Sequence, residues 1–260
     1  MVSILAALWL TSVAYTLPTT PTAYLLTADF DGFIPVLGGT EGKVTVKMGF
    51  TVTGLAADAE GNSQASSDLT DAELKFNGAP LPFDVDSVRN YFPKNTISFS
   101  AAGKITKNDA PDLTLPVRLP GLDVKRFPDI TYLPIEFPAA GIEVGTAFEF
   151  KKMFGDSEVS YVATPTKLEN DTLHVDIKLK QAYDNFEDEA KNVVKEKDAV
   201  SKVHTVVNGT GTIDFDLKKG MVTSSKVEAD SVSNATDIKT GNVTERKLKT
   251  TLKVELKPVK

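Results

Sequence analysis

Apolar and polar residues alternate along much of this chain. Residues 43–53 place apolar side chains at positions 44, 46, 48, 50 and 52, and residues 173–179 repeat the pattern. A period of two is typical of a β-strand with one buried face. The same pattern predicts further strands at 69–78, 141–153, 157–169, 203–217, 221–236 and 246–257. Polar or glycine-bearing segments such as 56–68 separate these runs, so we expect consecutive strands to be antiparallel.

Two segments depart from the strand period. From Asp84 to Phe92 the apolar residues have helical spacing, with Asp84 available as an N-cap and Pro93 as a stop, which predicts a short helix. Residues 182–203 mix dense charge with Phe186, Ala190, Val193 and Val194, which indicates either an amphipathic helix or a charged excursion. The predicted fold class is therefore mainly β, with one or two short helices.

Two hairpins are expected to turn at a glycine beside a lysine. Gly103 interrupts SFSAAGKITK, residues 98–107, and Gly220 interrupts DFDLKKGMVT, residues 214–223. Each half of the chain thus has strands, a helix-like insertion and a hairpin. This order predicts two similar curved antiparallel-sheet lobes, at 24–110 and 141–260. The alternative is that antiparallel β proteins look self-similar at this level, and the two hairpins would then not correspond.

A proline-rich segment joins the two predicted lobes. Residues 111–138 hold six prolines, and proline removes a backbone donor and fixes φ, so neither a central strand nor a long helix fits. Many apolar residues accompany the prolines. We therefore expect residues 111–140 to form an extended connector, packed on the body of the protein as a strap.

Composition excludes one class of partner. The chain has 260 residues, 41% of them hydrophobic, with 29 basic and 35 acidic side chains and a net charge of −6. Neither sign forms long blocks, so nucleic acid is not an expected partner, and an acidic chain docks poorly on anionic lipid.

The N-terminus resembles an export signal. An apolar run from Ile4 to Leu10 precedes Ser12 and Ala14, the small residues of a signal-peptidase site, so we expect a signal peptide over 1–14 with cleavage after Ala14. The run is too short to span a membrane, and no later run reaches that length, so no integral span is expected after signal removal. Cysteine is absent, which favours a bacterial envelope or secreted protein over a secreted eukaryotic one, because oxidising compartments favour disulfides. The predicted location is extracytoplasmic: periplasmic, cell-surface or secreted.

Three short motifs carry a family resemblance. They are Val144, Gly145, Thr146 and Phe148 after the proline-rich segment, then Gly209, Gly211, Phe215, Asp216 and Gly220, and the earlier hairpin at Gly103. In this order they resemble a family of uncharacterised secreted bacterial β proteins, although Phe148 stands where tryptophan is commoner. The resemblance implies export and a β fold, and no activity. More distantly, the layout is similar to bacterial envelope lipoprotein carriers, whose bent sheet wraps a lipid-sized cavity.

The sequence contains no recognisable set of catalytic residues. His174 and His204, the two histidines, are expected to face solvent from strands, and neither a GxSxG nor an HExxH motif occurs. Residues 38–44, GGTEGKV, lack the glycine spacing and the Ser or Thr of a phosphate loop. We therefore predict no catalytic residue, no cofactor and no metal site.

Two carboxylate pairs offer an alternative to the prediction that the chain has no catalytic or metal site. Asp29 with Asp31, and Asp214 with Asp216, each point to one side of a strand, where they could hold calcium or supply an acid and a base. A solvated strand face is the simpler interpretation, because no calcium loop is completed.

Aromatic composition favours an apolar ligand over a sugar. The single tryptophan, Trp9, lies in the predicted signal, which leaves Tyr91, Tyr132 and Tyr161 as stacking platforms for a carbohydrate, against fourteen phenylalanines. We therefore expect any cavity to be lined mainly by apolar side chains.

Three functions follow from these observations. The first is an exported, non-catalytic protein that binds an apolar or amphipathic ligand, such as a lipid, on a concave sheet. The second is a structural or adhesive surface module with a filled core. The third, a metal-assisted hydrolase, would need Asp29, Asp31, Asp214 or Asp216 to meet a histidine in space.

Overall fold

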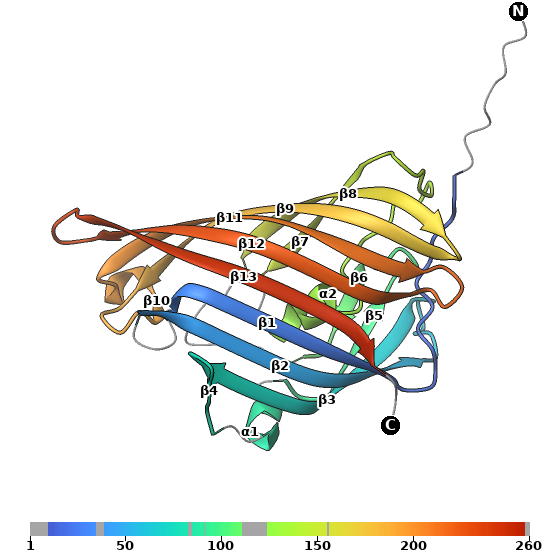
Figure 1. Cartoon of the computed structure of the whole chain (residues 1–260), viewed down its shortest axis with the longest axis horizontal. Coiled ribbons are helices and arrows are strands. Elements are labelled where there is room, and N and C mark those ends of the chain that lie inside the picture. The colour runs from blue at the N-terminus through green and yellow to red at the C-terminus, as the bar shows by residue number, and fades with distance from the viewer. Residues whose placement is uncertain are drawn as a thin grey trace, which may run out of the picture.

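The strands of this protein form one open antiparallel sheet, as a computed structural model shows for residues 10–34, 39–82, 85–90, 92–110, 124–154 and 156–257. Within these ranges the sheet has thirteen strands (Figure 1). They are β1 Thr22–Ile34, β2 Thr40–Leu55, β3 Ser63–Phe76, β4 Ala79–Pro80, β5 Asn95–Phe99, β6 Ile105–Asn108, β7 Phe148–Phe154, β8 Ser157–Glu169, β9 Thr172–Glu187, β10 Val193–Val194, β11 Ser201–Asp216, β12 Met221–Asp237 and β13 Val243–Lys257.

Helices are few and short. The α-helices are α1, Val85–Arg89, and α2, Phe127–Ile130, and 3-10 turns occupy Val124–Arg126 and Glu196–Asp198. Helix α1 confirms the short helix predicted in this region, although Asp84, its predicted N-cap, lies outside the described residues. No helix in the described parts of the chain has the length and apolar character needed to cross a membrane.

The charged segment 182–203 is an excursion and not an amphipathic helix. Strand β9 continues through it to Glu187, β10 pairs back on β9, and a 3-10 turn leads into β11. A short helix in this segment would need a buried apolar face. The apolar side chains do not provide one, since Val193, for example, is 39% exposed.

Pairing between the first and last strands makes the sheet continuous. The strand order is β6-β5-β3-β2-β1-β13-β12-β11-β9-β8-β7, and β1 pairs with β13 from Ala23 opposite Lys257 to Gly32 opposite Leu248. Strands from both halves of the chain therefore share one sheet, and the two predicted lobes are not seen. The physical reason is that β1 and β13 would each expose an unpaired strand edge if the halves closed separately.

The two glycine turns exist but do not correspond. Gly103 has φ +91° in the turn between β5 and β6, and Gly220 has φ +62° in the turn between β11 and β12. The first hairpin forms one edge of the sheet, whereas the second lies inside it. The sequence correctly predicted a glycine turn at each of the two positions. Its prediction that the two hairpins occupy corresponding places was wrong.

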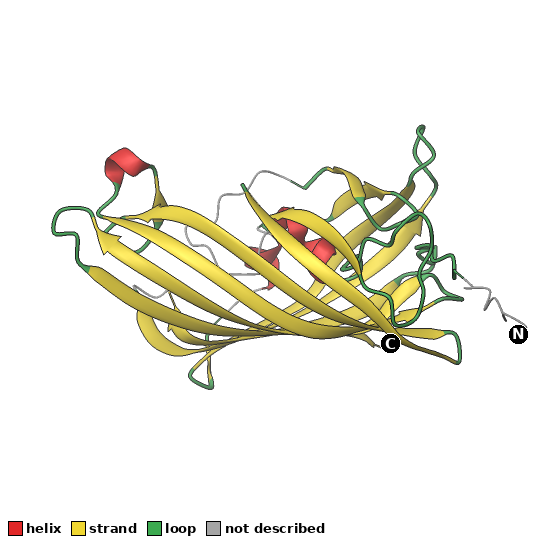
Figure 2. Cartoon of the chain, turned by 90° about the horizontal axis from the view of Figure 1, so that it is seen from above, coloured by secondary structure: helices red, strands yellow, loops and turns green. Residues whose placement is uncertain are grey.

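The sheet curves into a trough, and a segment of the chain lies in it (Figure 2). We call residues 124–142 the strap segment. Phe127, Tyr132, Leu133, Ile135 and Phe137 of this segment are all buried against the inner face of the sheet. Residues 111–123, the first part of the predicted connector, lie outside the described residues.

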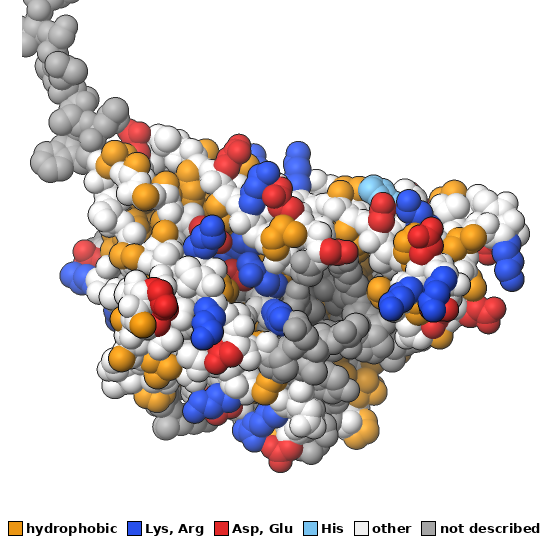
Figure 3. Space-filling model, turned by 180° about the vertical axis from the view of Figure 1, so that it is seen from behind, with side chains coloured by type: hydrophobic (Ala, Val, Ile, Leu, Met, Phe, Trp, Pro, Cys, Tyr) orange, Lys and Arg blue, Asp and Glu red, His pale blue; other side chains and the backbone are white. Residues whose placement is uncertain are grey.

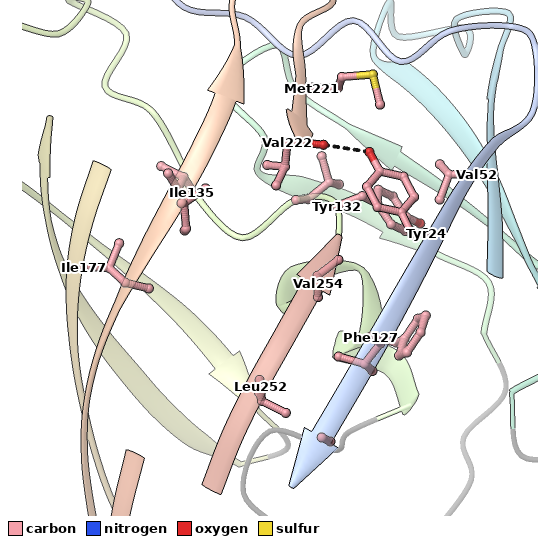
Figure 4. Close-up of a cluster of buried hydrophobic side chains, with 14 of the residues drawn as sticks. Tyr24, Val52, Phe127, Tyr132, Ile135, Ile177, Met221, Val222, Leu252 and Val254 are labelled. Carbon is pink, nitrogen blue, oxygen red and sulfur yellow. Dashed lines mark hydrogen bonds between the residues drawn. The ribbon is translucent and has the colours of Figure 1, made fainter. Parts of the chain in front are cut away.

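Aromatic contacts join the strap segment to both halves of the sheet. Tyr132 lies 6.5 Å from Tyr24 of β1, and Phe137 lies 5.1 Å from Phe215 of β11, measured between ring centroids. The close-up in Figure 4 shows how side chains from the strap segment and from several strands converge, and the hydroxyl of Tyr24 donates to the carbonyl of Val222 at 3.0 Å. Since each buried ring adds specific contacts to its hydrophobic burial, the strap segment stabilises the curvature of the whole sheet.

Candidate functional site

An apolar groove lies between the strap segment and the inner face of the sheet. Its roof is Asp129, Ile130 and Pro134, and its floor and walls come from six neighbouring strands, β7, β8, β9, β11, β12 and β13. The floor and wall side chains are Phe154, Val159, Tyr161, Ile177, Leu179, Gln181, Val207, Ser225, Val227, Ala229, Thr250 and Leu252. These residues face inward because alternation places every second side chain of each strand on the same face. Their character makes the groove mainly hydrocarbon.

The groove is narrow. Its volume is about 70 Å³, which is room for a few water molecules and is well below the range of roughly 300–1,000 Å³ found for small-molecule pockets. With the strap segment in this position, the groove accommodates a single slender chain at most. A bulkier ligand requires the strap segment to move.

A second, polar pocket lies on the same face of the sheet. It has a volume of about 40 Å³ and is lined by residues of β1, β9, β11, β12 and β13 together with Lys191 and Val193. Arg246 and Glu187 form an ion pair there at 2.6 Å, with side chains only 9% and 8% exposed. The guanidinium of Arg246 also lies 4.5 Å from the centre of the Phe33 ring. The pair is therefore held on two sides, which orients the guanidinium.

A charged cluster is buried beneath the strap segment. Lys152 of β7 contacts Asp129 at 2.6 Å, both side chains are fully buried, and the ammonium also donates to the Leu133 carbonyl at 2.6 Å. Arg126 lies 2.8 Å from the other Asp129 oxygen. Such a buried pair is costly to break, because the partner left behind would be an uncompensated charge. The cluster fastens the strap segment to the edge strand β7.

Glu136 borders this cluster and is half-buried. Burial raises the pKa of its carboxyl above the ordinary value, and the nearby charge of Lys152 only partly opposes this rise. Ionised Glu136 is thus disfavoured in the folded protein relative to the unfolded chain.

The predicted carboxylate pairs lie on the outer face and in turns. Asp29 accepts a hydrogen bond from Thr45 at 2.6 Å, and Asp31 lies 3.4 Å from Lys43. Asp216 accepts the backbone N–H groups of Lys218 and Lys219 in the turn before Gly220. Burial alone would raise the pKa of Asp216, but these bonds and the Lys219 ammonium lower it overall.

One predicted carboxylate does meet a histidine. Asp214 lies 2.7 Å from Nδ1 of His174, and Ser224 donates to its other oxygen at 2.7 Å. The carboxylate is the central member here, whereas nucleophilic triads need the histidine between serine and carboxylate. His204 forms a similar pair with Asp184 at 2.7 Å. Within the described ranges, no group of three or more His, Cys, Asp or Glu side chains is placed to hold a metal ion.

The two predicted aromatic platforms within the described residues, Tyr132 and Tyr161, are not available as flat surfaces. Tyr132 is completely buried and Tyr161 is 8% exposed, while Tyr91 and Trp9 lie outside the described residues. Tyr161 stacks on Phe150 at 4.7 Å between centroids. It therefore contributes to the wall of the groove and not to a sugar platform.

The groove and the polar pocket were not predicted residue by residue. One signal was present in the sequence: on β13 the inward positions Leu248, Leu252 and Val254 are apolar, and Thr250 interrupts them. On β12, Ser231 is likewise a buried polar residue at an inward position. Polar residues at core positions of a strand indicate either a structural hydrogen bond or a site.

Comparison with known proteins gives a likeness of fold. No family model matches the chain, and no curated protein matches it. The resemblance to secreted bacterial β proteins therefore rests on its short motifs alone.

Lipovitellin has a similar sheet. A structure describing lipid-protein interactions in lipovitellin aligns with a TM-score of 0.57 and 16% identity over 94% of this chain. The chain spans 25% of the lipovitellin chain, and at this identity the likeness shows the fold alone. An outer membrane channel from Pseudomonas putida F1 aligns with a TM-score of 0.17 and 9% identity over 95% of this chain and 99% of that chain, and it carries no argument.

Proposed function

We propose that this chain is a non-catalytic, exported protein that binds a single-chain apolar or amphipathic ligand in the groove beneath the strap segment. The observation that carries the proposal is the apolar groove itself, floored by one face of the curved sheet and roofed by Asp129, Ile130 and Pro134. The lipovitellin likeness supports it by analogy, since the similar structure describes lipid-protein interactions. The narrowness of the groove selects a single chain over a two-chain lipid.

Export and the lack of catalysis are parts of the same proposal. The apolar N-terminal run with Ala14 at its end supports export, and the absence of cysteine supports an extracytoplasmic place. The side chains of His174 and Asp214 face outward and are 38% and 37% exposed, which supports a solvated hydrogen-bonded pair over a catalytic arrangement.

The matched threonines Thr250 and Thr251 provide the test. Thr250 is buried and lines the groove, whereas Thr251, the next residue on β13, faces outward. The purified full chain is titrated with unlabelled undecanoic acid in a calorimeter, after native extraction to remove any bound lipid. We expect saturable binding, a loss of at least tenfold in affinity for Thr250→Phe, and unchanged affinity for Thr251→Phe.

A second candidate is favoured by the small volume of the groove. The groove would then be an imperfectly packed space under the strap segment that binds no ligand. In that case the protein is a structural module whose core is filled. Absence of any saturable signal with the wild-type chain, together with no lipid in the native extract, would establish that candidate and reject ligand binding.

A further inference from the structure

The apolar groove and the polar pocket adjoin on the inner face of the sheet, and we call the two spaces together the channel. On β9, β11, β12 and β13, a residue of the groove and a residue of the pocket stand two positions apart. The four pairs are Gln181 with Tyr183, Val207 with Thr205, Ala229 with Ser231, and Thr250 with Leu248. Since residues two apart on a strand share a face, the two spaces abut across all four strands.

Two buried hydroxyls at this junction lack partners. Thr250 lines the groove and Ser231 lines the pocket, and each side chain belongs to a residue only 3% exposed. Neither hydroxyl has a hydrogen-bond partner among the residues that the structure describes. Burying a hydroxyl without a partner costs about 1–3 kcal/mol, so two of them at one place call for an acceptor.

The charges of the pocket favour an anionic acceptor. Its lining holds one carboxylate, Glu187, against Arg246, Lys191 and Lys247. Glu187 is paired with Arg246, and Lys247 is paired with Glu245 outside the pocket. The lining of the pocket thus carries more cationic than anionic side chains, and the charge of Lys191 also acts on Asp188 beside the pocket. Figure 3 shows the side of the molecule opposite to Figure 1, where cationic and anionic side chains are interspersed.

The channel has the length of an acyl chain. From Thr250 on β13 to Phe154 on β7 the groove crosses six neighbouring strands, or about 24 Å along the sheet at ~4.8 Å between strands. This is of the order of the extended length of a long-chain fatty acid.

We infer that the ligand is a long-chain carboxylate, with its tail in the apolar groove and its head at the junction, where Ser231 and Thr250 donate hydrogen bonds to it and Lys191 compensates its charge. The inference rests on the proposed function, and it adds the chemical class of the ligand and its direction in the channel. No covalent step is involved. The buried Arg246–Glu187 pair forms the polar end of the channel.

Replacement of Thr250 by the isosteric valine tests the inference. Stability in urea and affinity for oleate should change in opposite directions. Thr250→Val keeps the shape of the side chain and removes an unpaired buried hydroxyl, so the lipid-free protein should unfold at a higher urea concentration. The same variant should bind oleate about tenfold more weakly at pH 8, because the carboxylate loses a donor. Thr251→Val should leave oleate affinity unchanged.

Charge is tested at Lys191. Lys191→Gln should weaken oleate binding several-fold and leave methyl oleate binding unchanged, because the ester has no charge. Lys197→Gln is the matched control, since Lys197 is exposed in the same loop and does not line the pocket.

The possible failures are distinguishable. If oleate and methyl oleate bind equally and Thr250→Val changes neither affinity, the head-group inference is wrong while ligand binding in the groove stands. If neither ligand binds the wild-type chain, both the proposed function and this inference are wrong.

Discussion

The backbone N–H of Thr16 donates a hydrogen bond of 2.8 Å to the carbonyl of Gly220, more than two hundred residues later in the chain. The preceding residue, Tyr15, donates its N–H to Ala101 at 2.8 Å, in the turn that contains Gly103. Adjacent residues near the N-terminus therefore connect the two hairpin turns that the sequence singled out. Tyr15 itself is buried, with its ring 5.0 Å from Phe215.

This contact explains why glycine is needed at 220 beyond the turn itself. A Cβ at Gly220 would collide with the backbone and side chain of Thr16, whereas a Cβ at Gly241, another glycine with positive φ, would meet nothing within 4 Å. We expect Gly241→Ala to cost about 1 kcal/mol and Gly220→Ala about 3 kcal/mol of unfolding free energy. Urea denaturation of both variants measures the difference. Equal costs would show that the Thr16 contact contributes nothing.

The buried Lys152–Asp129 pair should be the most sensitive polar contact. Lys152→Ala leaves the Asp129 carboxylate without its fully buried partner, and we expect a loss of about 3–5 kcal/mol. Lys151→Ala is the matched control, because Lys151 is the adjacent residue, is 63% exposed and pairs with Glu158, so its replacement should destabilise the protein far less. If Lys152→Ala fails to fold, the double variant Asp129→Leu, Lys152→Met should recover folding, because it removes both charges and Arg126 keeps access to solvent. Failure of the double variant too would contradict this account.

Phe137 should carry much of the packing between the strap segment and the sheet. Its ring lies 5.7 Å from Tyr15, 6.2 Å from Phe148 and 5.1 Å from Phe215. We expect Phe137→Ala to lower the unfolding free energy by about 3–5 kcal/mol through lost burial and the cavity left behind. Val144→Ala, at a position 47% exposed, should change it by no more than about 0.5 kcal/mol. Similar effects of the two changes would mean that the strap segment is not packed as described.

The free energy of unfolding should depend on pH through the carboxyl of Glu136. Its folded-state pKa is raised by burial, so the protonated carboxyl is favoured in the folded protein, and stability from this group is full at acid pH and declines as the pH rises through the folded pKa. Glu136→Gln should therefore be more stable than the wild type at neutral pH, and this advantage should shrink on acidification. Chemical denaturation of both proteins between pH 4 and pH 8 measures it. An advantage that is constant over this range would exclude titration of Glu136 as the cause.

The sequence predicted local structure well because local structure depends on neighbouring residues. Alternation places Leu173, Val175 and Ile177 on one face of a strand, and all three are buried in β9. Positive φ at Gly103 and Gly220 follows from the same kind of local requirement. Strand β1 was predicted only around Asp29 and Asp31, although its regular alternation extends over Thr22–Ile34.

What the sequence by itself determined was a mainly β chain with glycine turns, a short helix near residue 88 and an apolar, proline-rich segment unsuited to a central strand. Only the tertiary structure decided that β1 pairs with β13 in one sheet, that Asp129 meets Lys152, and that the unpartnered hydroxyls of Ser231 and Thr250 lie at one junction. The physical reason is that alternation specifies which face of a strand is buried, and neither the neighbouring strand nor the segment that covers that face. Those choices depend on contacts between residues far apart in the chain, and in this protein such contacts build the candidate site.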